Sequence, residues 1–314
     1  MAWLEVILHT ANCGAEVAAG ILGQAGFSEL VLEDKQEYEQ FLEQNRAYWD
    51  YVDEAFQEKM EGLSQIKLYI DSEDRESKAA LEALAREYGW QMDIALLPET
   101  DWEEDWKANY PPVAVGEKLM VIPYWAEKSA AQGRLPVILD PGLTFGTGAH
   151  PSTQMVMEVM EQRLTPGSIC LDLGSGSGIL SIAALRLGAK QALGVDIDPK
   201  AEDIARENGA YNGFAAPELM TYTGNVTTDR PLMDRLSRQR YDMVLVNIVA
   251  DVIIGLSPVL PKYLTSESIL ICSGILHDRL TEVKASLEQV GLTVLEIRAK
   301  EDWRCIVAKK ENNI

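Results

Sequence analysis

A glycine-rich loop is the feature of this sequence that most restricts how the chain can fold. The eight residues from Leu171 to Gly178 read LDLGSGSG; an apolar segment expected to be a strand precedes them and an apolar helical segment follows. Glycines let the backbone turn tightly and let a ligand approach where a Cβ would stand in the way. Free amides at the start of the helix suit a carboxylate or a phosphate. A nucleotide site and a simple tight turn are both compatible with the loop alone.

The spacing of the loop indicates which nucleotide it would bind. The GxGxxG pattern of dinucleotide sites needs a glycine at the position of Ile179, whereas this loop reads D-x-G-x-G-x-G. Asp196 ends the next expected strand, 22 residues after Gly174, where its carboxylate can accept hydrogen bonds from both ribose hydroxyls of an adenosine. These features favour S-adenosylmethionine over NAD as the cofactor. Its methionine part would lie near Gly174 and Gly176, and its ribose on Asp196.

The rear part of the chain alternates strands and helices. The expected strands cover 169–173, 192–196, 219–223, 241–247, 269–273, 293–298 and 304–308. The expected helices cover 178–187, 200–212, 249–260 and 280–290. Repeated strand-then-helix order predicts an α/β, Rossmann-like domain of seven strands with helices on both faces. The last two strands have no helix between them, so one of the two is expected to be antiparallel.

The front part has a different order of elements. Strand patterns at 3–9, 28–32, 65–70 and 92–97 alternate with helical patterns at 15–22 and 77–88. Once a Glu/Gln-rich helical insert at about 35–62 is set aside, the order is β-α-β-β-α-β, which predicts a smaller α+β ferredoxin-like domain. We therefore expect a front domain at 1–100, a linker with bordering strands at 101–135, and the larger domain at 136–314.

The charge of the chain, −21 overall, is concentrated in this front part. Residues 1–110 hold 25 acidic and 8 basic side chains, a net charge of −17, whereas residues 111–314 hold 24 and 20. An acidic module of this kind repels phosphate backbones and should prefer a basic partner, so no direct nucleic-acid binding is expected. A solvated acidic surface that only aids solubility is the alternative.

Two further polar residues stand where they can face the cofactor. The loop from Asp140 to Thr153 holds three glycines, three threonines and a histidine, which is typical of a lid over a ligand. Thr153 follows at the start of a helix, where its hydroxyl can cap the helix or reach the cofactor. Asn247 ends the fourth strand, where its amide can hold an amine in line behind the S–CH₃ bond or cap the next helix.

Several other residue classes point to simpler roles. His9, His150 and His277 are too scattered for a metal site, and we predict none. Aid from His150 in amine deprotonation is a weaker alternative to a hydrogen-bonding role, and no general base is assigned. Four cysteines form no CxxC pair, and no stretch reaches about 20 apolar residues. The sequence therefore predicts a reduced, cytoplasmic protein that does not enter a membrane.

The motifs taken together resemble the PrmA family. The resemblance rests on the loop from Asp140 to Thr153, the DLGSGSG loop, VDIDP at 195–199, VNI at 246–248 and SGIL at 273–276. It is close from about residue 102 onward, whereas the front part matches in architecture more than in motif. Ser152 stands where a second threonine is usual, and the insert lengthens the front domain. The VNI turn lacks the prolines of the NPPY-type amide and base methyltransferases.

The resemblance implies an activity as well as a fold. The PrmA family uses S-adenosylmethionine to methylate lysine side chains and the N-terminal α-amine of ribosomal protein eleven of the large subunit. Its front domain binds this protein substrate. Carried over by resemblance, the cofactor contacts are Thr153, Gly174, Asp196 and Asn247. A methyltransferase acting on another protein, RNA or a small molecule, and a non-catalytic S-adenosylmethionine-binding module, are the alternatives.

Overall fold

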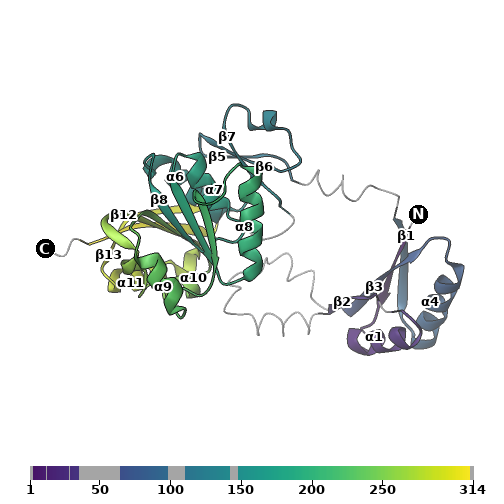
Figure 1. The fold of residues 1–314 in the computed structure, drawn as a ribbon. Coiled ribbons are helices and arrows are strands. Elements are labelled where there is room, and N and C mark those ends of the chain that lie inside the picture. The colour runs from purple at the N-terminus through teal and green to yellow at the C-terminus, as the bar shows by residue number, and fades with distance from the viewer. Residues whose placement is uncertain are drawn as a thin grey trace. The chain divides into compact units, whose positions relative to one another are not determined.

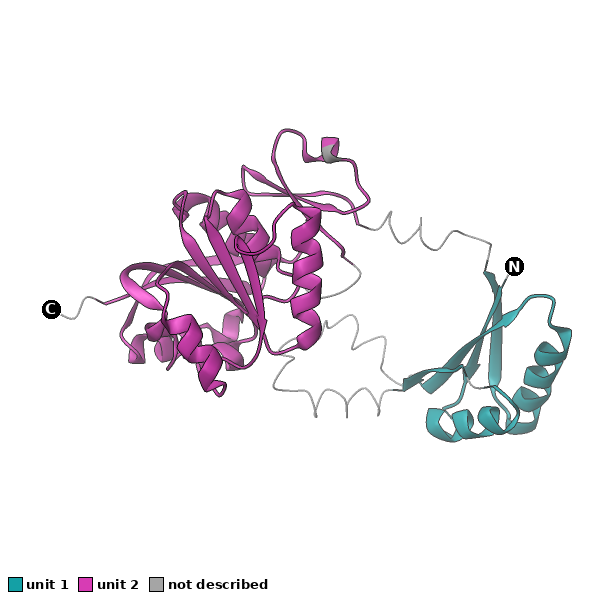
Figure 2. Ribbon diagram, viewed as in Figure 1, with its two compact units in different colours: residues 1–109 teal, residues 110–314 magenta. Residues whose placement is uncertain are grey.

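The computed structural model describes residues 3–11, 13–27, 29–34, 64–97, 110–141 and 148–311 of the chain (Figure 1). The chain divides into two compact units, Met1–Asn109 and Tyr110–Ile314 (Figure 2). The helical insert expected at 35–62 lies outside the described residues, and the domain limits derived from the sequence stay predictions. In the described part, no helix is long and apolar enough to span a bilayer.

The described part of unit 1 is a four-stranded antiparallel sheet with two helices. Its elements are β1 (Trp3–His9), α1 (Ala15–Gln24), β2 (Val31–Asp34), β3 (Ser64–Asp71), α4 (Arg75–Tyr88) and β4 (Gln91–Leu97). The strand order β2-β3-β1-β4 with all pairs antiparallel confirms the predicted ferredoxin-like arrangement. Alternate residues of the strands pack against the helices in one core, which includes Val6, Leu8, Leu22, Ile66, Leu68 and Leu81.

Strand β2 lies later in the chain than the sequence predicts. It covers Val31–Asp34 and not 28–32, because polar side chains extend its pairing with β3. Glu33 accepts hydrogen bonds from Lys67 at 2.7 Å and from Gln65 at 2.5 Å. Charged residues that pair across two strands carry no apolar alternation, so the period of two does not reveal this strand.

Unit 2 contains a seven-stranded sheet in the order β10-β9-β8-β11-β12-β14-β13. The strands are β8 (Ile169–Leu173), β9 (Gln191–Asp196), β10 (Leu219–Thr223), β11 (Tyr241–Asn247), β12 (Leu264–Leu276), β13 (Leu292–Lys300) and β14 (Trp303–Lys310). Strand β14 pairs antiparallel with both β12 and β13, so it is the antiparallel member of the last two strands. The predicted Rossmann-like sheet is confirmed.

Helices cover both faces of this sheet (Figure 1). They are α6 (Pro151–Arg163), α7 (Ile179–Arg186), α8 (Pro199–Tyr211), α9 (Arg230–Ser237), α10 (Ala250–Leu256) and α11 (Leu280–Gln289), with short 3₁₀ turns at Lys128–Ala131, Leu260–Lys262 and His277–Arg279. Alternate residues of β11 enter two separate cores: Val244 and Val246 pack with α9, α10 and α11, whereas Met243 and Leu245 pack with α6 and α7.

Two helices differ from the sequence prediction. Helix α9 was not predicted, because only Leu232 and Leu236 of its eight residues are buried and four of the others are polar or charged. The helix expected at 249–260 ends at Leu256, because Pro258, two residues later, has no backbone N–H with which to continue the helical hydrogen bonds.

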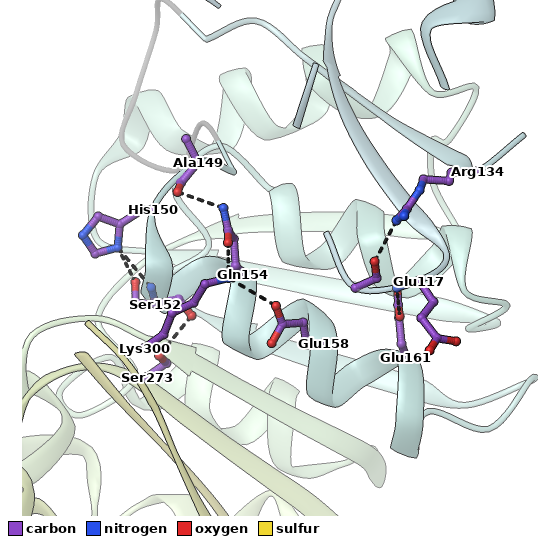
Figure 3. A network of polar contacts seen from close by, with 11 residues as sticks. Glu117, Arg134, Ala149, His150, Ser152, Gln154, Glu158, Glu161, Ser273 and Lys300 are labelled. Carbon is purple, nitrogen blue, oxygen red and sulfur yellow. Dashed lines mark hydrogen bonds and ion pairs between the residues drawn. The ribbon is translucent and has the colours of Figure 1, made fainter. Parts of the chain in front are cut away.

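A second, three-stranded sheet of unit 2 is held to α6 by one carboxylate. It consists of β5 (Val113–Val115), β6 (Leu119–Pro123) and β7 (Leu135–Leu139). The Glu161 side chain accepts hydrogen bonds at 2.9–3.0 Å from three consecutive backbone N–H groups, those of Glu117, Lys118 and Leu119. Figure 3 shows Glu161 beside Glu117. Gly116 makes room for the carboxylate, because a Cβ there would lie 2.3 Å from Glu161 Oε2.

The turn after β11 is enclosed by two glycines from neighbouring strands. A Cβ on Gly174, which follows β8, would lie 2.5 Å from Ile248 Cγ2. A Cβ on Gly274, within β12, would lie 2.5 Å from the Ile248 carbonyl oxygen. Both glycines have φ near +80°, which other L-residues rarely adopt. The approach of three strand ends around Ile248 therefore requires glycine at both positions.

We expect Glu161→Ala to lower the stability of unit 2 by about 2 kcal/mol, because three backbone amides lose a charged acceptor together. The matched control is Glu158→Ala on the same helix, whose carboxylate forms a partly exposed ion pair with Lys300 at 3.3 Å. That change should cost less than about 1 kcal/mol. Calorimetric melting of both variants checks the difference, and equal losses would contradict the anchoring role of Glu161.

We expect Gly274→Ala to destabilise unit 2 by about 3 kcal/mol or more, since it adds positive-φ strain to a clash with the Ile248 backbone. The control is Gly255→Ala within α10, where a Cβ meets nothing within 4 Å. This control should leave stability unchanged or raise it by up to about 1 kcal/mol. Urea denaturation of the two variants tests the comparison; a Gly274→Ala variant as stable as the wild type would disprove the close approach.

Candidate active site

Adjacent strands bring most of the predicted site residues to one edge of the large sheet. Strand β8 lies between β9 and β11, and all three run parallel. Their carboxyl ends carry Gly174 and Gly176 after β8, Asp196 at the end of β9 and Asn247 at the end of β11. Thr153 of α6 joins them, because Asn247 Nδ2 donates to Thr153 Oγ1 at 3.0 Å. The structure therefore gathers all five residues at this edge.

Asp196 is tied to the glycine loop by its carboxylate. Its Oδ2 accepts from the Gly176 amide at 2.9 Å, and its Oδ1 accepts from the Asp198 amide at 3.0 Å. The Gly174 amide donates in turn to the Val195 carbonyl at 2.8 Å. Each carboxylate oxygen has a second lone pair, so the partly buried Asp196 can still accept hydrogen bonds from two hydroxyls of a ligand.

Asn247 presents a buried acceptor that has no partner within the described structure. Its Nδ2 is fixed by Thr153, which is 2% exposed, while its Oδ1 is buried and unpaired. Neither side chain caps a helix, because the N-caps of α6 and α10 are His150 and Val249. A buried acceptor without a donor costs about 1–3 kcal/mol, so this oxygen suits a donor that a ligand brings.

The first turn of α6 is held from two sides (Figure 3). His150 Nδ1 accepts from the Ser152 amide at 3.3 Å, and burial lowers the pKa of His150. The ring packs edge-to-face on Trp303, with centroids 4.6 Å apart. Ser273 Oγ donates to the Ser152 carbonyl at 3.0 Å, a contact between distant parts of the chain that the sequence did not reveal. His150 thus acts as a neutral helix cap at pH 7.

Asp172, the acid at the start of the glycine pattern, is a second buried acceptor at this edge. It is 1% exposed; its Oδ2 accepts from the amide and the hydroxyl of Ser181 in α7, at 3.1 and 2.8 Å. Its Oδ1 has no partner in the described structure. Burial raises the pKa of Asp172 to about 7, with a further contribution from the charge of Asp196.

Two residues for which the sequence predicts no role follow the ends of the neighbouring strands β9 and β10. Ile197 is 58% exposed although it is apolar. Asn225 follows β10, the strand next to β9, and its Oδ1 accepts from the amide and hydroxyl of Thr227. Their positions in the sequence could have indicated them, since Ile197 directly follows β9 and Asn225 comes two residues after the end of β10.

Other predicted features are only partly visible. Residues 142–147 of the expected lid lie outside the described residues. Among the residues that are described, no group of three or more His, Cys, Asp or Glu side chains is placed to hold a metal ion. Burial raises the pKa of Cys170 and of Cys305 to about 12, so both are thiols at neutral pH, and Cys272 is buried as well.

We expect Asp172 to make stability depend on pH. Its folded pKa of about 7 lies above the ordinary value of 3.8, so its contribution is complete below pH 4 and is lost as the pH rises toward 7. Relative to Asp172→Asn, the wild type should lose up to about 1.4 kcal/mol per pH unit in this window.

The pH dependence is checked by melting both proteins between pH 5 and 8. Asp242→Asn serves as the control, because Asp242 is an exposed aspartate that also accepts from a β8 amide, that of Ile169 at 2.8 Å. A constant difference between wild type and Asp172→Asn across the range would rule out a buried, proton-binding Asp172.

Comparisons with known proteins agree over almost the whole chain. A family model described as ribosomal protein L11 methyltransferase (PrmA) matches residues 2–311. The ribosomal protein L11 methyltransferase of Alkaliphilus oremlandii is 35% identical over 319 residues, which cover 98% of this chain and 99% of the relative. That of Heliobacterium modesticaldum is 36% identical over 321 residues, covering 99% and 98%.

A solved structure also matches. The crystal structure of ribosomal protein L11 methylase from Lactobacillus delbrueckii subsp. bulgaricus superposes with a TM-score of 0.58 at 27% identity. The match covers 65% of this chain and 100% of that one. With the family model spanning nearly every residue and relatives above 30% identity along their full length, this chain belongs to the PrmA family of ribosomal protein L11 methyltransferases.

Proposed function

We propose that the chain is a methyltransferase that transfers methyl groups from S-adenosylmethionine to amines of ribosomal protein L11. The observation that supports this most directly is the buried Asn247 Oδ1, which has no hydrogen-bond partner in the described structure. Thr153 fixes the same amide through its Nδ2, at the edge that also carries the glycine loop and Asp196. An acceptor that lacks a donor at a cofactor edge suits an N–H group of a substrate. Relatives along the whole chain carry the name of this activity.

The residues at this edge fit the parts of S-adenosylmethionine. Asp196 would accept from the ribose hydroxyls, and Gly174 and Gly176 leave the backbone bare beside the methionine part. The exposed Ile197 would pack on the adenine ring, which offers an apolar face. When bound, this cofactor supplies a methyl group on a positively charged sulfur.

Asn247 would orient the substrate amine. Its Oδ1 would accept a hydrogen bond from the amine, and Thr153 would keep the amide from rotating. The nitrogen lone pair would then point along the line of attack, and this orientation supplies most of the acceleration. A lysine amine has an ordinary pKa of about 10.4, and removing the amine from water favours the neutral form that can attack. Lysine side chains and the N-terminal α-amine are the acceptors that the family resemblance implies.

The acidic front part supports a protein partner over an RNA partner. Residues 1–110 have a net charge of −17, from 25 acidic and 8 basic side chains. A protein that binds RNA in the ribosome is expected to be basic, so opposite charges would speed its encounter with this unit. Direct binding of RNA would bring two polyanions together.

We place the reaction in the cytoplasm, without contact to a membrane.

The proposal is tested by incubating the purified chain with methyl-labelled S-adenosylmethionine and L11, followed by intact-mass analysis. We expect methylated amines on L11 and none on protein-free ribosomal RNA. Labelled RNA would favour the RNA reading, and cofactor binding without any transfer would favour a non-catalytic module. Failure to bind S-adenosylmethionine at all would overturn the proposal.

Two variants separate cofactor binding from transfer. Asp196→Ala should weaken S-adenosylmethionine binding by about tenfold or more, because the ribose loses a charged acceptor. Asn247→Ala should lower kcat by about 100-fold at saturating cofactor, because the amine loses its orientation. The control is Asp203→Ala on α8, an exposed carboxylate paired with Arg206. Unchanged cofactor affinity in Asp196→Ala would contradict its ribose role.

A further inference from the structure

Helix α8 carries two buried asparagines one turn apart. Asn208 is 0% exposed, and Asn212, which ends the helix, is 6% exposed. Both amides use their oxygen and their nitrogen in hydrogen bonds to backbone groups outside α8. Because both buried side-chain amides have hydrogen-bond partners for their oxygen and their nitrogen, we infer that these residues matter for their hydrogen bonds and not for packing alone.

Asn208 joins two loops of the candidate active site. Its Oδ1 accepts from the Asp140 amide at 2.9 Å, and its Nδ2 donates to the Ser177 carbonyl at 2.9 Å. Asp140 directly follows β7 and begins the segment that leads to α6. Ser177 lies in the glycine loop, directly before the N-cap of α7. One side chain therefore links the end of β7 to the glycine loop.

Asn212 also hydrogen-bonds to the backbone at β7, but at Ile138, two residues before Asp140. Its Oδ1 accepts from the Ile138 amide at 2.9 Å, and its Nδ2 donates to the Ile138 carbonyl at 2.7 Å. It thus pairs with both backbone groups of one residue on the edge strand β7, as a neighbouring strand would. Arg186 of α7 adds a hydrogen bond to the same Oδ1 at 3.1 Å. Asn212 secures β7 without contacting the glycine loop.

Helix α8 packs closely against the glycine loop at Gly178. A Cβ on Gly178 would lie 2.9 Å from Ala205 Cβ and 3.2 Å from Ala205 Cα. At its other end, α8 begins at Pro199, three residues after Asp196, with Asp198 as its N-cap. The helix is therefore coupled to the ribose-binding carboxylate at its start and to the glycine loop at Ala205 and Asn208.

We propose that Asn208 is a positioning residue for the cofactor site, acting through the Ser177 carbonyl and the Asp140 amide, and that Asn212 serves stability alone. The inference rests on the proposed binding of S-adenosylmethionine. Asn208 acts on the cofactor edge only through backbone groups, the Ser177 carbonyl of the glycine loop and the Asp140 amide directly after β7. A site whose supporting bonds are lost must reorder its loops on binding, which lowers affinity.

The two asparagines form a matched pair for the test, since they share a helix, a chemistry and a buried environment. In the full chain, Asn208→Ala should raise the Kd and the KM for S-adenosylmethionine by about tenfold and change kcat by less than about twofold. Asn212→Ala should lower the melting temperature by at least as much and leave the Kd unchanged. Calorimetric titration well below both melting temperatures measures the Kd, and Asn208→Ser provides a milder variant if Asn208→Ala does not fold.

A measurement without cofactor keeps this inference separate from the proposed function. Hydrogen exchange of the amides from Gly174 to Gly178 should be faster in Asn208→Ala than in Asn212→Ala. Equal exchange, or equal Kd values in the two variants, would overturn the positioning role. If the wild type bound no S-adenosylmethionine, the proposed function would fail, while faster exchange in Asn208→Ala alone would still support the loop coupling.

Discussion

The close approach of three strand ends around Ile248 is the constraint on which the rest of the site depends. Gly174 accommodates the side chain of Ile248, and Gly274 accommodates its backbone. Because both glycines also adopt positive φ, the strand ends can converge without strain. Asn247 directly precedes this turn, so the direction of its amide follows from the same packing. The glycines thus act first on the protein's own backbone, and the open edge for a ligand is a consequence.

Around that turn, long-range hydrogen bonds fix the surrounding elements. Asn247 and Ser273, which lie side by side on β11 and β12, each bond to the first turn of α6, at Thr153 and at the Ser152 carbonyl. In the same way, Asn208 of α8 holds the glycine loop by a hydrogen bond to the Ser177 carbonyl. Buried polar bonds of this kind specify one arrangement where apolar packing alone would allow several. The edge is therefore built in advance of any ligand.

The sequence predicts the features that depend on residues close together in the chain, and it does not predict contacts between residues far apart in the chain. The strands and helices of unit 2 follow from local apolar periodicity, and the glycine spacing together with Asp196 pointed to residues that the structure brings to one edge of the sheet. Helix α9 was missed because it is short and mostly polar, with only two buried apolar side chains. The roles of Glu161, Ser273 and Asn208 were invisible because each partner lies at least 31 residues away in the chain. Only the folded sheet brings those partners within reach.

Buried acceptors without a hydrogen-bond partner lower the free energy of unfolding, and two of them lie in strands that end at this edge. In the described structure, four buried side-chain polar atoms lack a hydrogen-bond partner, and two of them are Asn247 Oδ1 and Asp172 Oδ1. Each belongs to a strand that ends at the sheet edge carrying Gly174 and Asp196, although donors such as serine hydroxyls are common nearby. A chain selected only for stability would satisfy such atoms, since each costs about 1–3 kcal/mol. Their retention beside a fully bonded framework of Thr153, Ser181 and Asn208 argues that this edge is completed by what it binds.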